Sequence, residues 1–172
     1  MKNVIKIFSP NQKAYDSWAP AILRIVVGFG FFAHGIAKMI KGPEGFAKLL
    51  SQIKVPAPEV LAWMAITVEV LGGLALILGI LVSIVSIPLI ITMLTALFTI
   101  HYKFGYSSVK TISLDENGPK FGPPGYEINL LYIATLLILI EFGAGKLSVD
   151  SLTVKRNGAR EEPLQPDIQD CN

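Results

Sequence analysis

The sequence has little cysteine and little charge. Its one cysteine, Cys171, has no second thiol with which to form a disulfide or a CxxC redox pair within the chain. Charged residues make up 16% of the chain, and the formal net charge is only +2. A charge this small and this dispersed does not favour a nucleic-acid partner. The composition therefore speaks against thiol chemistry by this chain alone and against nucleic-acid binding.

Apolar residues are correspondingly abundant. They account for 52% of the chain, and the mean hydropathy of +0.54 is well above that of an ordinary soluble domain. A length of 172 residues corresponds to one domain. We therefore expect a membrane protein without separate soluble catalytic domains.

Four segments are long and apolar enough to cross a bilayer, which takes about 20 helical residues for a core of about 30 Å. Residues 70–100 carry no charge, and as one helix they would extend about 46 Å, so this run must contain a turn. The predicted spans are residues 18–39, 57–80, 83–102 and 127–145. The sequence thus predicts an all-α fold, a membrane-spanning four-helix bundle.

The predicted topology places both ends of the chain on one side of the membrane. The first apolar run contains Arg24 and lacks a small-x-small cleavage site, so we interpret it as a retained span and not a signal peptide. A slight excess of lysine and arginine on the side of the termini favours cytoplasmic termini. Residues 1–150 then form the membrane domain, with a short amphipathic helix expected near residues 44–53. The polar segment 151–172 is expected to be disordered.

The chain resembles the DoxX family of small four-helix membrane proteins. The resemblance lies in RIVVGFGFFAHGIAKM (24–39), VPAPEVLAWMAITVEVLGGLALILG (55–79), the apolar third helix ending at His101, PPGYEINLLY (123–132) and GAGKLSVD (143–150). Proteins of this kind are membrane parts of redox systems, and one relative is a subunit of a thiosulfate:quinone oxidoreductase. The resemblance therefore implies quinone-linked redox chemistry.

Three charged residues are expected in the inner half of the bundle. Counting about 1.5 Å per residue from the helix ends places Arg24 and Glu69 at the same depth on adjacent antiparallel helices, and this predicts a buried ion pair. Glu141 lies at a similar depth and is a candidate second carboxylate. Two interpretations stay open, a charge pair that fixes helix register and a proton relay.

A second polar group is expected near the outer face. It consists of His34, Lys38, His101 and Glu127, to which Trp63 or Glu59 adds a contribution from the second helix. Histidine, lysine, a carboxylate and nearby aromatic rings supply the donors, acceptors and apolar walls that a quinone head group needs. The alternative is that the histidines only hydrogen-bond across helices while Lys38 extends to the interface. Two histidines are too few to favour a metal site or haem.

These observations predict an inner-membrane component of a redox system that binds quinone near the outer leaflet, with no covalently bound cofactor. No flavin, haem or iron–sulfur motif is visible, so electrons would come from a redox partner protein. Self-association into a homo-oligomer is also open. The alternative is a non-enzymatic scaffold or assembly protein, or a small-molecule transporter, in which the charges specify packing or passage.

Overall fold

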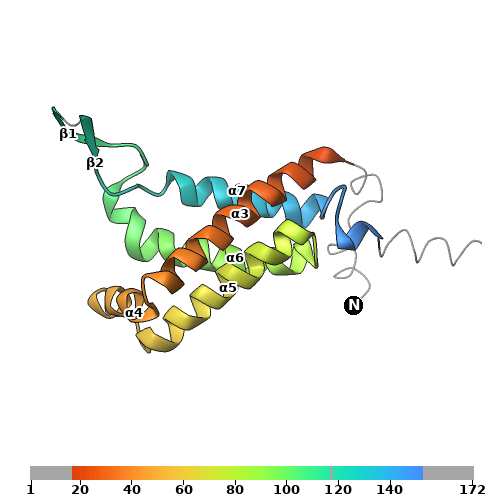
Figure 1. Ribbon diagram of the computed structural model, residues 1–172, viewed down its shortest axis with the longest axis horizontal. Coiled ribbons are helices and arrows are strands. Elements are labelled where there is room, and N and C mark those ends of the chain that lie inside the picture. The colour runs from red at the N-terminus through yellow and green to blue at the C-terminus, as the bar shows by residue number, and fades with distance from the viewer. Residues whose placement is uncertain (1–16, 117, 153–172) are drawn as a thin grey trace, which may run out of the picture.

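The computed structural model describes residues 17–116 and 118–152. Cys171, the lysines before residue 17 and the predicted tail beyond residue 152 lie outside the described residues. The described chain is mainly helical, in agreement with the predicted fold class (Figure 1). Its α-helices are α3 (Trp18–Ile40), α4 (Pro43–Gln52), α5 (Pro58–Leu78), α6 (Val82–Ala96) and α7 (Glu127–Phe142).

Three stretches of the described residues are long and apolar enough to cross a membrane: α3, α5 and the continuous helix Val82–Phe104. That last stretch begins as α6 and continues through a π-helical segment, η1 (Leu97–His101), and a 3-10 segment, η2 (Tyr102–Phe104). The predicted break in the uncharged run is confirmed, because α5 ends at Leu78 and Gly79 takes the left-handed conformation with φ +70°. Glycine adopts that conformation at no steric cost.

The fourth predicted span is shorter than expected. Helix α7 begins at Glu127, as predicted, but it ends at Phe142 after 16 residues, which is about 24 Å of helix and less than the hydrocarbon thickness. Gly143 and Gly145 then have positive φ values, and the chain turns back under the first turns of α3. Ser151, which we expected in the polar tail, is still buried in a helical turn over residues 149–152.

Helices α3 and α5 pack closely because glycines line their contact. A Cβ atom added to Gly35 would lie 2.6 Å from Val70 Cγ2, and one added to Gly73 would lie 2.5 Å from the backbone nitrogen of Phe32. Neither position has room for a side chain, so the glycines let the two backbones approach. An apolar core lies beside this contact. Its largest fully buried side chains are Phe31, Ile66, Leu76, Leu89, Leu136 and Leu139.

The two long connections differ from each other. The first contains α4, close to the predicted amphipathic helix. The second contains an antiparallel hairpin of β1 (Thr111–Asp115) and β2 (Gly118–Phe121), which we did not predict from a segment rich in glycine and proline. An ion pair of 2.5 Å between Lys120 Nζ and Asp115 Oδ2 joins its strands.

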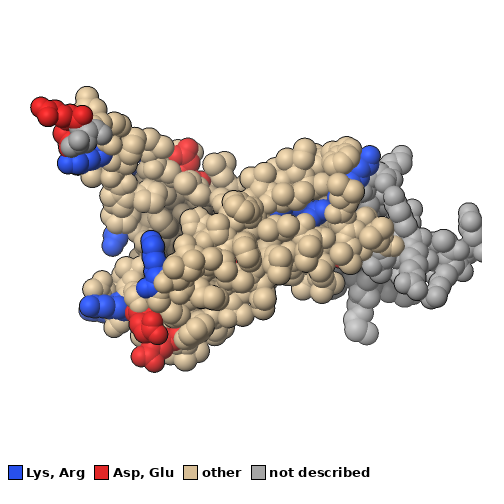
Figure 2. Space-filling model, viewed as in Figure 1, with Lys and Arg blue, Asp and Glu red and all other residues tan. Residues whose placement is uncertain are grey.

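Both connections lie at the same end of the bundle, and both described chain ends lie at the other (Figure 1). The backbone nitrogen of Lys146 donates to the carbonyl of Ser17 at 3.1 Å, which ties those ends together. On the face drawn in Figure 2, charged side chains gather mainly at the end with α4 and the hairpin, and the middle is almost wholly uncharged. We call the two ends the closed end, at Ser17 and the α5–α6 turn, and the cavity end, at α4 and η1.

Candidate functional site

Arg24 is the largest buried side chain of the closed end, with no exposed surface. All five of its N–H groups donate to main-chain carbonyls. Nε donates to Ala144 at 2.8 Å and Nη1 to Leu76 at 2.9 Å, and the remaining acceptors are the carbonyls of Ile77, Lys146 and Leu147. Leu76 and Ile77 lie in the last turn of α5, whose carbonyls have no partner within the helix. Arg24 therefore closes the end of α5 against the segment that follows α7.

The predicted Arg24–Glu69 ion pair is wrong. The hydrogen bonds of Arg24 go to carbonyls, and the carboxylate of Glu69 binds Lys38 instead. Glu141 lies exposed in the last turn of α7 and does not share the guanidinium, as the predicted second carboxylate would have to do. The three residues do not form the predicted common network.

The buried ion pair of the described residues joins Lys38 at the end of α3 to Glu69 in the middle of α5. Nζ of Lys38 lies 2.5 Å from Oε1 and 2.7 Å from Oε2 of Glu69. Glu69 is 2% exposed and Lys38 is 27% exposed. The ammonium also lies 4.6 Å from the centre of the Phe46 ring on α4. Because a buried carboxylate is costly without a partner, Lys38 supplies what Glu69 needs.

The helix register explains the exchange of partners. Glu69 faces Gly35, where an added Cβ would lie 3.1 Å from the Glu69 Cβ. Gly35 follows Arg24 by three turns of α3, roughly 16 Å along the axis, but it precedes Lys38 by less than one turn. The depth count assumed that α3 and α5 begin at opposite membrane faces with their ends aligned. In the structure they are staggered, so that Arg24 meets the end of α5.

A cavity of about 640 Å³ occupies the cavity end between α3, α4, α5, α6, η1 and α7. Three of the four residues predicted for an outer quinone site line it, namely His34, Lys38 and His101, and Glu69 joins them. Sequence analysis missed further polar residues of the lining, the threonines Thr92, Thr95 and Thr99 and, in α7, Asn129 and Tyr132. The place of Asn129 and Tyr132 in the first two turns of the fourth helix, in an otherwise apolar run, is the signal that would have found them.

His101 is held by a single hydrogen bond from its ring. Its Nδ1 lies 3.0 Å from the carbonyl oxygen of Pro124, in the connection that precedes α7. The π-helical turn of η1, which ends at His101, sets the direction of the side chain. π-Helical turns are rare and occur frequently at functional sites.

Glu127, the fourth predicted residue, is placed elsewhere. It is not among the described residues that line the cavity. Its Oε2 accepts a hydrogen bond of 3.1 Å from the backbone nitrogen of Ser108. A carboxylate in the first turn of α7 also complements the positive end of the helix dipole. Its observed contacts fix the hairpin connection to α7.

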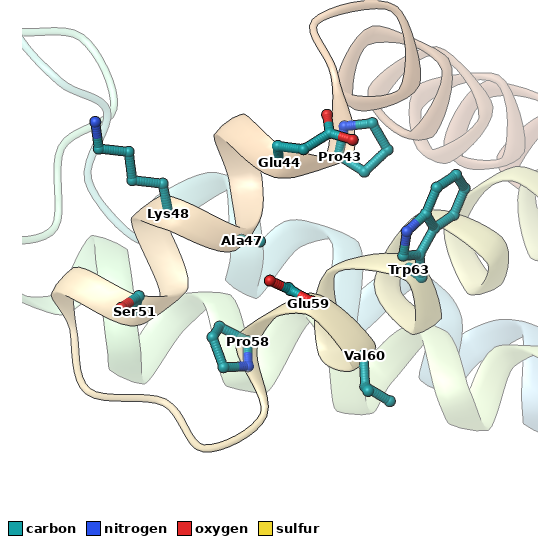
Figure 3. A pocket seen from close by; sticks show the side chains of 9 residues that line it. All are labelled: Pro43, Glu44, Ala47, Lys48, Ser51, Pro58, Glu59, Val60 and Trp63. Atoms are coloured by element: carbon teal, nitrogen blue, oxygen red, sulfur yellow. The ribbon is translucent and has the colours of Figure 1, made fainter.

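A second cavity, of about 650 Å³, lies between α4 and the start of α5 (Figure 3). Glu59 and Trp63 line this cavity, together with Glu44 and Lys48 from α4, and they do not line the one that holds His34 and His101. The expected contribution of Glu59 or Trp63 to the outer site is therefore not seen. Within the described ranges, no group of three or more His, Cys, Asp or Glu side chains is arranged to hold a metal ion.

Comparison with known proteins identifies the family. The DoxX family model matches residues 19–102, which include Arg24, His34, Lys38, Glu69 and His101. The chain belongs to the DoxX family. Its matched region contains α3, α4, α5, α6 and η1, and therefore most of the walls of the cavity.

Curated proteins of two bacteria are similar to the chain. An uncharacterized protein of Haemophilus influenzae is 33% identical over 78% of this chain and 82% of its own length. A second uncharacterized protein of that organism is 28% identical over 85% of this chain and 98% of its own length. A Bacillus subtilis protein named "Putative oxidoreductase CatD" is 29% identical over 48% of this chain and 59% of its own length. No solved structure matches the chain.

Proposed function

We propose that this DoxX-family membrane protein is a quinone-binding component of an inner-membrane redox system, and that the cavity of His34, Lys38 and His101 holds the quinone head group. One observation carries the proposal. Residues from the end of α3 and from η1, singled out as polar groups in apolar helices, line one cavity with a buried ion pair. Intramembrane ionisable groups gathered in an apolar cavity are the expected form of a ligand site.

The walls suit a lipid-soluble ring. Apolar side chains from four helices surround the polar groups, and exposed apolar residues stand at the rim: Leu49, Met64, Ile91 and Ile128. In a membrane protein, exposed apolar side chains on the helices face lipid, so the cavity opens where a quinone is dissolved. The relative named as an oxidoreductase agrees with a redox role. A partner protein would supply or accept the electrons, and both chain termini would lie in the cytoplasm, with the cavity near the outer leaflet.

The experiment is extraction of the full chain from membranes, followed by quantification of the quinone that co-purifies. The parent should carry quinone, and His34→Ala and His101→Ala should lose most of it while keeping the thermal unfolding midpoint. Glu141→Gln is the matched control, because Glu141 is exposed outside the cavity. Quinone-free parent protein that also fails to bind added quinone would overturn the proposal. The non-enzymatic scaffold would then stand, with the cavity residues serving only in packing.

A further inference from the structure

The wall that α6 and its continuation η1 contribute to the cavity, which we call the α6 wall, presents acceptors of hydrogen bonds. Thr92, Thr95 and Thr99 line the cavity. Each hydroxyl already donates its proton to the carbonyl four residues earlier, at 3.0 Å to Pro88, 2.8 Å to Ile91 and 2.6 Å to Thr95. A hydroxyl has one proton and two lone pairs. Toward a ligand, these three hydroxyls can therefore only accept hydrogen bonds.

His101 and Asn129 follow the same pattern. A carbonyl oxygen only accepts, so the contact with Pro124 places a proton on Nδ1 of His101 and leaves Nε2 of the neutral ring as an acceptor. The amide nitrogen of Asn129 points at the carbonyl of Met93, 3.4 Å away, and this orientation leaves Oδ1 as an acceptor. Both residues line the cavity. The donors of these residues thus point at the protein, since the amide nitrogen of Asn129 also lies 3.8 Å from Met93 Sδ. The hydroxyl of Tyr132, which also lines the cavity, lies against Gly30 of α3 and so belongs to the opposite side.

The opposite wall offers one strong donor. Lys38 has three N–H groups, and its Nζ contacts both carboxylate oxygens of Glu69. A ligand that spans the cavity therefore meets an ammonium donor on the α3 side and several acceptors on the α6 and α7 side. An oxidised quinone has two carbonyl acceptors and no donor, so it satisfies Lys38 but leaves its other carbonyl against lone pairs. A hydroquinone has a hydroxyl for each wall.

We propose that this cavity selects the reduced, hydroquinone form of an apolar-tailed quinone, with one hydroxyl donating to the acceptor wall of His101, Asn129 and the α6 threonines. This inference rests on the proposed function and adds to it the redox form that the site recognises. An unpaired polar group in a low-dielectric cavity is costly. Because the donors of this wall already bond to the protein, the second carbonyl of the oxidised form would be left without a donor, and this weakens its binding. The apolar rim accommodates the tail on the lipid side.

The test measures equilibrium binding of three decyl-tailed probes to the purified full chain in lipid nanodiscs under anaerobic conditions: a hydroquinone, its dimethyl ether and the matching benzoquinone. The ether keeps the ring and the tail but has lost both donors. We expect the hydroquinone to bind about tenfold tighter than either of the others, as one to two extra hydrogen bonds would give. Equal binding, or tighter binding of the benzoquinone, overturns this inference and leaves the proposed function standing. Failure of all three probes to bind overturns both.

Variants locate the effect within the wall. Thr95→Val removes a hydroxyl while keeping the side-chain shape, and it should lower the preference for hydroquinone about twofold. Thr135→Val is the matched control, because Thr135 makes the same bond to the carbonyl four residues earlier, at 2.8 Å, but lies outside the cavity lining. His101→Phe should lower the preference further, by about fivefold. Equal losses in Thr95→Val and Thr135→Val would contradict recognition through the α6 wall. The probe comparison on the parent chain decides the main point if a variant does not fold.

Discussion

The two ends of the bundle hold their buried cations in opposite ways. At the closed end, every N–H of the Arg24 guanidinium donates to a backbone carbonyl. At the cavity end, Lys38 pairs with one carboxylate beside a cavity of about 640 Å³. The first arrangement joins a side chain to main-chain carbonyls of two segments. The second joins two side chains that both line a cavity.

The different surroundings of Arg24 and of the Lys38–Glu69 pair distinguish their roles, which the residue types alone do not. Arginine and glutamate in apolar helices are equally strong candidates for function on grounds of cost. The surroundings decide between them, because a guanidinium saturated by carbonyls has no donor left for a substrate. The Lys38–Glu69 pair is different, because its lysine is partly exposed and both side chains line a cavity. We therefore place Arg24 among the residues that hold the fold and the Lys38–Glu69 pair among those that line the cavity.

The largest test of this comparison is removal of the guanidinium. Arg24→Met would remove five hydrogen bonds to carbonyls in a buried site, of which only that of Leu76 keeps another donor among the described residues, the backbone nitrogen of Gly79. It should cost at least about 3 kcal/mol of unfolding free energy. For a chain of this size such a loss lowers the thermal unfolding midpoint by roughly 10 °C. Thermal unfolding of the detergent-solubilised protein, followed by circular dichroism, provides the measurement.

Two further variants serve as controls for Arg24→Met. Arg24→Lys keeps the charge but has three donors for five carbonyls, so it should recover only part of the loss. Lys41→Met removes an exposed cation at the other end of the same helix and should unfold like the parent. If Arg24→Met also unfolds like the parent, the closed end is not held by these bonds, and the contrast between the ends disappears.

The second test concerns the two partners at the cavity end. Lys38→Met strands a carboxylate that is 2% exposed, whereas Glu69→Gln strands an ammonium that is 27% exposed and free to extend to the interface. We expect losses of about 3 kcal/mol and about 1 kcal/mol, respectively, in the same unfolding measurement. The asymmetry should follow from burial alone.

The double variant sharpens that expectation. With both charges removed no ion is left buried, so Lys38→Met combined with Glu69→Gln should be more stable than Lys38→Met by itself. If the double variant is the least stable of the three, the attraction between Lys38 and Glu69 itself stabilises the fold. The carboxylate would then not be the unstable partner that Lys38 neutralises.

Much of this fold could be predicted from the sequence because length and hydropathy limit the alternatives. The run over residues 70–100 is too long for one span, and glycine marks its turn, so the break between α5 and α6 was predictable. The hairpin was not, because its strands are short and polar and take their shape from pairing with each other. The length of α7 also escaped prediction, since residues 143–145 carry no charge and extend the apolar run, but the chain turns there to meet Arg24.

The candidate site shows the same limit at the level of side chains. The sequence contains the polar residues, and depth counting brought His34, Lys38 and His101 together. It assigned Glu69 to the wrong cation because the stagger of α3 against α5 depends on which glycines meet across the interface. A slip of two or three helical turns changes the partner without changing any pattern in the sequence. Charge partners in a membrane bundle are thus predictable only once the register is known.

The smallest test returns to the closed end, where Asp150 supports the turn that Arg24 seals. Its Oδ1 and Oδ2 accept from the backbone nitrogens of Leu81 and Val82, at 2.9 Å and 3.1 Å, and so cap the start of α6. Asp150→Ala removes both acceptors and should cost about 1 kcal/mol of unfolding free energy. Asp150→Asn keeps one oxygen and should cost about half of that if hydrogen bonding is the cause. Equal losses in the two variants, measured by the same thermal unfolding, would instead assign the effect to the negative charge at the helix start. The closed end would then depend on charge as the cavity end does, and only the cavity itself would distinguish the two ends.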